Sequence, residues 1–134
     1  MAESNMIRID PKTRKLREIG IGMLGYGFMG KMHSTAYIKI PFQTDWAPAK
    51  PVLVAMCGRN EEKVRNAALR YGYQGYYTRW QDLVSDPKIE IFDNCGPDFM
   101  HCDPCIAAAE AMKHIVCEKP FAVTTEDARR IVLA

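Results

Sequence analysis

The chain has 134 residues, 48% of them hydrophobic and 25% charged, which suits one globular domain with a real core. Its net charge of +2 resides in residues 1–18, where five basic side chains outnumber three acidic ones. We therefore expect a basic tail over 1–18, a neutral domain over 19–134 and no nucleic-acid partner. No apolar run is long enough to span a membrane and no secretion leader is seen, so we expect no membrane partner and a cytoplasmic location.

Residues 19–30 contain the most informative stretch of the chain. An apolar run leads into Gly25-x-Gly27-x-x-Gly30, and a segment with helical periodicity follows. This order is typical of a dinucleotide-binding turn. Gly25 makes the tight turn, Gly27 leaves room for a pyrophosphate, and Gly30 lets the helix approach the strand. The phosphates then face free N–H groups at the positive end of the helix.

Strands and helices alternate along the rest of the chain. Buried strands are predicted in 19–24, 51–57, 76–77, 89–95 and 115–117. Helices are predicted at 28–38, after Asn60 as far as Gly72, after Thr78, after Asp103-Pro104 and after Thr124. Residues 41–51 contain three prolines and are expected to form a loop. The alternation predicts an α/β fold with a doubly wound parallel sheet of the Rossmann type.

The end of the second strand bears on the choice of cofactor. NAD-preferring sites place a carboxylate here for the ribose 2′-hydroxyl, whereas this strand is followed by Arg59. Glu61 and Glu62 come slightly later, in the first turn of a helix. A planar guanidinium suits the 2′-phosphate of NADP, so NADP is favoured over NAD.

Ligands of such sheets bind at the carboxyl ends of the strands, near the point where strand order reverses. Three segments are expected to meet there, namely 25–30, 95–97 and 117–120. Lys119 could hydrogen-bond a substrate hydroxyl and stabilise developing alkoxide charge, and Glu118 could bind ribose hydroxyls. From pattern alone, a surface ion pair between these two residues is the simpler interpretation. His33, on the apolar face of the first helix, is expected to be structural.

Three motifs together resemble one known family, the glucose–fructose oxidoreductase / inositol dehydrogenase (Gfo/Idh/MocA) family. They are Gly25-Tyr-Gly-Phe-Met-Gly30-Lys-Met-His33, Gly96-Pro97-x-x-x-His101 and Ala111-Met-Lys-His-Ile-Val-Cys-Glu118-Lys119-Pro120. The resemblance covers residues 19–134, and its most specific part is the Glu-Lys-Pro segment. It implies an NAD(P)-dependent oxidoreductase that acts on sugars, inositols or related polyols.

The resemblance also implies roles for individual residues. Lys119 is the expected catalytic lysine, and no metal is expected. The expected cofactor-binding residues are Gly25, Gly27, Phe28, Met29, Gly30, Arg59, Gly96, Pro97, His101, Glu118 and Lys119. The chain departs from the family pattern at Met112, where glycine is usual, and at Gly96, where threonine is usual.

Family members carry a second α/β domain with an open sheet, which supplies the substrate pocket and acid–base residues. We therefore expect this chain to be the nucleotide-binding part of a longer protein, which binds dinucleotide but does not oxidise a polyol by itself. The longer protein is expected to form an oligomer. The alternative is a non-catalytic module that binds NADP(H) or serves as a partner subunit.

A thiol or metal site is a rival interpretation of Cys102-x-x-Cys105 beside His101. Five cysteines without a secretion signal indicate reduced thiols, so a disulfide framework is not expected. No second ligand pair has the spacing of a zinc site. Asp103 and Pro104 are already explained as the start of a helix, which leaves the motif little independent support.

Overall fold

The computed structural model describes residues 16–45 and 47–134, and their core is a five-stranded parallel sheet. The strands are β1 (Arg17–Leu24), β2 (Ala49–Cys57), β3 (Gly75–Tyr77), β4 (Ile91–Asn94) and β5 (His114–Cys117). Their order across the sheet is β3-β2-β1-β4-β5, and every pair is parallel. The predicted doubly wound α/β fold is confirmed, with the order reversing beside β1.

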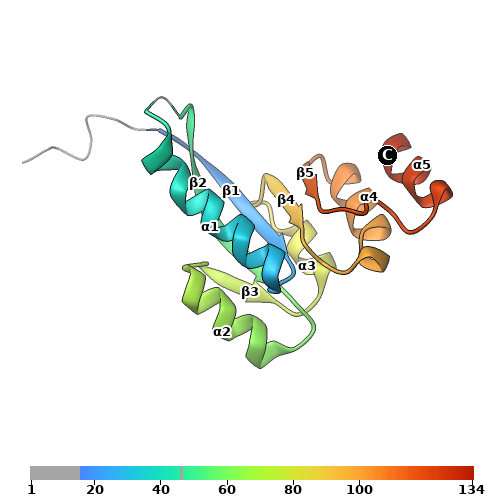
Figure 1. The fold of residues 1–134 in the computed structure, drawn as a ribbon, viewed down its shortest axis with the longest axis horizontal. Coiled ribbons are helices and arrows are strands. Elements are labelled where there is room, and N and C mark those ends of the chain that lie inside the picture. The colour runs from blue at the N-terminus through green and yellow to red at the C-terminus, as the bar shows by residue number, and fades with distance from the viewer. Residues whose placement is uncertain (1–15, 46) are drawn as a thin grey trace, which may run out of the picture.

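Five α-helices accompany the sheet, and four of them cover its two faces (Figure 1). They are α1 (Phe28–Gln43), α2 (Glu61–Tyr71), α3 (Trp80–Ser85), α4 (Cys102–Glu110) and α5 (Thr125–Leu133). A short 3-10 helix, η2 (Asp98–Met100), precedes α4. Helices α1 and α2 cover one face, α3 and α4 cover the other, and α5 packs against α4. Each face thus buries its own apolar core.

The β1 strand contributes to both cores because its side chains alternate between the faces. Ile21 and Met23 pack toward α1 and α2, whereas Leu24 packs toward α3 and α4. All five residues from Gly20 to Leu24 are buried. A strand that is buried on both faces shows a continuous apolar run, which is the signal on which its prediction depended.

Several helix ends follow the predicted chemistry. The Asn60 side chain accepts a 3.0 Å hydrogen bond from the Lys63 N–H, and Thr124 caps α5 through the Asp127 N–H at 3.0 Å. Gly72 ends α2 in the left-handed conformation, with φ of 82°.

The predicted capping role of Asp103 is wrong. Helix α4 begins at Cys102, two residues before the predicted first helical residue Pro104, with His101 in the cap position and no side-chain cap. The Asp103 carboxylate instead pairs with the Arg130 guanidinium of α5 at 3.3 Å. The cap residue His101 donates its N–H to the Asp98 carbonyl oxygen of the preceding 3-10 turn at 3.0 Å, and Pro104 in the first turn of α4 has no N–H that needs a cap.

The loop predicted at residues 41–51 is mostly regular structure. Helix α1 continues through Pro41 to Gln43, and β2 already begins at Ala49. Proline has a helical φ and removes only one hydrogen bond, which the exposed last turn tolerates. Pro51 lies in β2 opposite Ile19, in a part where β3 does not pair with β2.

The expected basic tail lies almost entirely outside the described residues, and β1 begins at Arg17, two residues before the expected domain start. Among the described residues, no helix has the length and apolarity that crossing a membrane requires.

Candidate functional site

The carboxyl ends of β1, β2 and β4 surround a cavity of about 560 Å³. It is lined by Leu24, Gly25, Tyr26, Gly27, Cys57, Gly58, Arg59, Thr78, Arg79, Trp80, Gln81, Cys95, Gly96, Pro97 and Met100. The segments come from distant parts of the chain and meet because parallel strands end at the same edge. Two of the three segments predicted to meet, the glycine turn and the segment after β4, line this cavity.

The glycine turn has the tight packing that its motif predicts. Gly25 has φ of 103°, and a Cβ atom there would lie 2.6 Å from the Cys95 carbonyl oxygen. A Cβ atom on Gly30 would lie 2.2 Å from the Gly25 carbonyl oxygen. Gly27 differs, because a Cβ atom there would meet nothing within 4 Å. The space beside Gly27 is therefore open for a ligand.

These residues fit a dinucleotide phosphate group. The turn leads directly into α1, which has 16 residues and no acidic side chain in its first turn. The first N–H groups of such a helix have no partner within it and attract anions. Phe28 and Met29 occupy the first two positions of α1, where their backbone N–H groups belong to this set.

Two arginines line the part of the cavity where the adenosine of a dinucleotide is predicted to bind. Arg59 follows β2 as expected, and Arg79 follows β3. Trp80 and Thr78 line the same region. Sequence analysis did not select Arg79, Trp80 or Thr78, although the end of a third predicted strand was the available signal.

Gly96 and Pro97 line the cavity, whereas His101 lies behind them. The His101 side chain is buried, and its ring nitrogens face the carbonyl oxygens of Gly96 at 3.0 Å and Pro120 at 2.7 Å. His101 thus joins the loop after β4 to the segment after β5. Its predicted contact with the cofactor itself stays a prediction.

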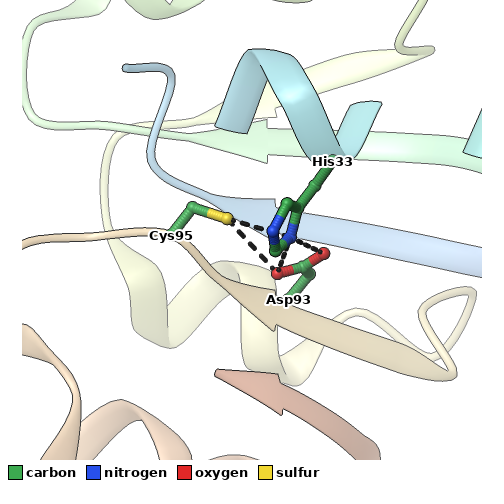
Figure 2. A group of neighbouring side chains, drawn as sticks. All are labelled: His33, Asp93 and Cys95. Carbon is green, nitrogen blue, oxygen red and sulfur yellow. Dashed lines mark hydrogen bonds and ion pairs between the residues drawn. The ribbon is translucent and has the colours of Figure 1, made fainter. Parts of the chain in front are cut away.

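A polar cluster connects α1, β4 and the segment after β5, and Figure 2 shows three of its members, His33, Asp93 and Cys95. His33 Nδ1 lies 2.9 Å from Asp93 Oδ2, and His33 Nε2 lies 3.0 Å from Glu118 Oε1. The Tyr37 hydroxyl donates to Asp93 Oδ2 at 2.9 Å, and Cys95 Sγ lies 3.3 Å from His33 Nδ1. His33 thus contacts Glu118, a predicted site residue, and its expected structural role stays a prediction.

The cluster changes the ionisation of its members. Burial disfavours the charged imidazolium of His33, but the Asp93 and Glu118 carboxylates outweigh it and raise the pKa of His33. Burial, reinforced by Asp93, raises the pKa of Tyr37 and of Cys95. Tyrosine and cysteine thus stay neutral here, while His33 is the group that gains a proton.

Asp93 was missed by sequence analysis. It is 1% exposed in β4, between the buried Phe92 and the buried Asn94. A carboxylate inside a buried strand was the available signal, because such a group needs a partner.

The side chains of His33, Asp93 and Cys95 also include the donor types of a metal site, with one ligand atom from each within 4.8 Å of the others. These atoms already hydrogen-bond one another, and the raised pKa of Cys95 opposes the thiolate that ligation needs. We therefore describe a hydrogen-bonded cluster, and the expectation of no metal stays a prediction.

The Cys102-x-x-Cys105 motif lacks the surroundings of a reactive thiol pair. Cys105 is fully buried, and its neighbour on β4 is Asn94. Burial raises the pKa of Cys102, and although a hydrogen bond with Cys117 lowers the pKa of Cys105, that thiol has no exposed surface at which a reactant could meet it.

Glu118 and Lys119 follow β5 at the same edge of the sheet. The Glu118 N–H donates to the Asn94 carbonyl oxygen at 3.0 Å, and the Lys119 N–H donates to Glu118 Oε2 at 3.2 Å. The Lys119 side chain is exposed and forms no ion pair with any residue in 16–45 or 47–134. The surface ion pair between Glu118 and Lys119 is thus not formed, because Glu118 pairs with His33.

Comparisons with known proteins agree with this geometry. Residues 19–134 match the model of the GFO_IDH_MocA family, described as an oxidoreductase family with an NAD-binding Rossmann fold. The chain is 40% identical over 114 residues to levoglucosan dehydrogenase of Pseudarthrobacter phenanthrenivorans, covering 85% of this chain and 29% of that protein. It is 28% identical over 123 residues to inositol 2-dehydrogenase of Salmonella typhimurium, covering 91% and 33%.

Solved structures give the same result. A levoglucosan dehydrogenase in complex with NADH and levoglucosan superposes with a TM-score of 0.84 at 40% identity, covering 86% of this chain and 31% of that one. The chain therefore belongs to the GFO_IDH_MocA oxidoreductase family and comprises its NAD-binding Rossmann fold. It spans about a third or less of the length of these relatives.

Proposed function

We propose that this chain is the cofactor-binding part of an oxidoreductase that transfers hydride between a nicotinamide dinucleotide and a sugar, inositol or related polyol. The observation that carries the proposal is the glycine turn, which opens beside Gly27 at the same sheet edge as Lys119. The related levoglucosan and inositol dehydrogenases support this class of substrate. An oligomer of the longer protein and a cytoplasmic location stay predictions.

The residues proposed to hold the dinucleotide divide into two groups: Arg59 and residues 25–27 line the cavity, whereas Glu118 follows β5 at the same edge of the sheet. The turn from Gly25 to Gly30 would hold the pyrophosphate through backbone N–H groups. Arg59 would face the adenosine ribose, and Glu118 would face the ribose at the nicotinamide end. When bound, the nicotinamide supplies the hydride acceptor or donor.

Lys119 is the proposed catalytic residue. Its side chain is exposed at the edge, and its backbone is held by the Glu118 carboxylate. A lysine in this position can donate a hydrogen bond to a substrate hydroxyl and stabilise negative charge on that oxygen.

We infer a preference for NADP over NAD from Arg59. No carboxylate follows β2 directly, and Arg79 adds a second cation to the lining of the same cavity. Two guanidinium groups favour a 2′-phosphate over a 2′-hydroxyl because they can pair with its oxygens. The levoglucosan dehydrogenase complexes contain NADH, so this preference would distinguish the chain from that relative.

Titration of NADPH and NADH into the unaltered chain and into the Arg59→Ala variant tests dinucleotide binding and the contact between Arg59 and the 2′-phosphate. We expect NADPH binding to weaken by about tenfold or more, because a charged hydrogen-bond partner is lost, and NADH binding to change little. Arg70→Ala, on the exposed last turn of α2, is the matched control. An equal loss for both cofactors would contradict the phosphate contact, and no binding of either by the unaltered chain would contradict the proposed function.

A further inference from the structure

We propose that His33 is a positioning residue, whose imidazolium is held between Asp93 and Glu118 and fixes Glu118 for cofactor binding. The inference deepens the proposed function and rests on it, because the ligand of Glu118 is the proposed dinucleotide. Neither His33 nor Glu118 lines the cavity, but Glu118 follows β5 at the same edge of the sheet and is the residue of this pair with a proposed cofactor contact. His33, which lies 3.0 Å from the Glu118 carboxylate, would therefore act through Glu118.

Both ring nitrogens of His33 face carboxylates. Nδ1 lies 2.9 Å from Asp93 Oδ2 and 3.1 Å from Oδ1, and Nε2 lies 3.0 Å from Glu118 Oε1. Figure 2 shows the ring extending from α1 toward Asp93 on β4, with Cys95 beside it. Only the imidazolium has an N–H for each carboxylate, since neutral imidazole has a single N–H.

The charges around the ring favour the same state. The groups that face His33 are Asp93 from β4, Glu118 after β5, and the neutral side chains of Tyr37 on α1 and Cys95 after β4. Within the described ranges, neither Asp93 nor Glu118 pairs with a lysine or arginine. His33 is thus the cation that compensates the buried Asp93, whose side chain is 1% exposed.

Glu118 links His33 to the proposed cofactor site. One of its oxygens contacts His33, and the other accepts the Lys119 N–H at 3.2 Å. The backbone of Glu118 is held by the hydrogen bond that its N–H donates to the Asn94 carbonyl oxygen. With His33 protonated, the Glu118 carboxylate is therefore held at both oxygens, next to the proposed catalytic lysine.

Deprotonation reverses the effect. When the remaining proton stays on Nδ1 toward buried Asp93, the lone pair of Nε2 faces Glu118 Oε1, which repels the carboxylate. Because the carboxylates raise the pKa of His33, the fixed arrangement exists below that raised pKa and is lost as pH rises through it. Cofactor affinity should therefore fall with rising pH.

The first experiment measures the ring of His33 directly, without cofactor. The sequence contains three histidines, so the His33→Gln variant identifies the His33 signal by its disappearance from NMR titrations. We expect the His33 pKa to lie above its ordinary value of about 6.5, and Glu118→Gln to lower it. A pKa at or below the ordinary value, or no response to Glu118→Gln, would overturn the inference whatever the cofactor does.

The second experiment titrates NADH into the unaltered chain and into His33→Gln between about pH 6 and about pH 9. At low pH we expect His33→Gln to bind NADH roughly tenfold more weakly than the unaltered chain. At high pH we expect equal affinities, because neither protein then carries an imidazolium at position 33. His114→Gln is the matched control, since His114 is exposed at the opposite end of β5.

The outcomes separate the two proposals. A loss of affinity in His33→Gln that is the same at every pH would show a purely structural residue and would refute the positioning role. Unchanged affinity in His33→Gln at low pH would also refute it. If no protein binds NADH or NADPH, the proposed function fails, and the NMR titration still decides the charge state of His33.

Discussion

The space available for a Cβ atom differs between two glycines of the turn, Gly27 and Gly30. Gly30 has no room for a Cβ atom, because the Gly25 carbonyl oxygen would lie 2.2 Å away. Gly27 has room on the protein side and lies at an ordinary φ of −73°. Packing thus requires a glycine at position 30, whereas at position 27 only the proposed contact with a dinucleotide would require one.

Alanine substitutions separate these reasons. Gly30→Ala should lower the free energy of unfolding by about 1–3 kcal/mol, because backbone must move to admit the methyl group. Gly27→Ala should change it by only about 0.5 kcal/mol, while weakening dinucleotide binding by about tenfold or more. Urea unfolding and NADPH titration of both variants provide the measurement. A Gly27→Ala variant that binds as well as the unaltered chain would place the pyrophosphate elsewhere.

The connection between α4 and β5 shows how an element end can carry strain. Met112 has φ of 57° and is 90% exposed. The family pattern described above has glycine at this position. A left-handed conformation is unfavourable for a side chain with a Cβ atom but not for glycine. The neighbouring Lys113 ammonium donates to the carbonyl oxygens of Asp86 and Ile89, at 2.9 and 2.7 Å, and holds the turn in place.

Met112→Gly should therefore stabilise the domain. We expect the free energy of unfolding to rise by about 0.5–1 kcal/mol, because the relieved strain exceeds the entropy that glycine adds to the unfolded chain. Met112→Ala retains the Cβ atom and is the control, with little expected change. Equal effects of the two substitutions in urea unfolding would assign the gain to loss of the exposed apolar side chain instead.

The cavity lies at the edge of the sheet where β1, β2 and β4 end. A ligand that binds there contacts segments from both halves of the sheet, so binding opposes global unfolding. Ligand that binds only the folded state stabilises it by an amount that grows with ligand concentration.

Thermal unfolding of the chain with NADPH should show this coupling. At a hundredfold excess over the dissociation constant, the expected gain is about 2.7 kcal/mol, or roughly 5–10 °C in Tm for a domain of this size. The Gly27→Ala variant should show a smaller shift at the same concentration. Equal shifts in both proteins would indicate binding outside the glycine turn.

Much of the fold could be predicted because its signals are local. The glycine turn, the apolar strands and the caps at Asn60, Gly72 and Thr124 each depend on a few adjacent residues. The errors at Asp103 and at residues 41–51 have a common cause. Proline and aspartate have several favourable positions, and the neighbouring elements choose among them.

The sequence by itself determined the order of strands and helices, the glycine turn and the last residue of every strand except β4, since chain-local chemistry specifies these. Only the tertiary structure decided which strand ends are neighbours. The strand order β3-β2-β1-β4-β5 places Arg79 in the same cavity as Arg59. It also brings His33 to Asp93, 60 residues away, and to Glu118, 85 residues away. Such contacts depend on the packing of α1 across the sheet, which no local pattern encodes.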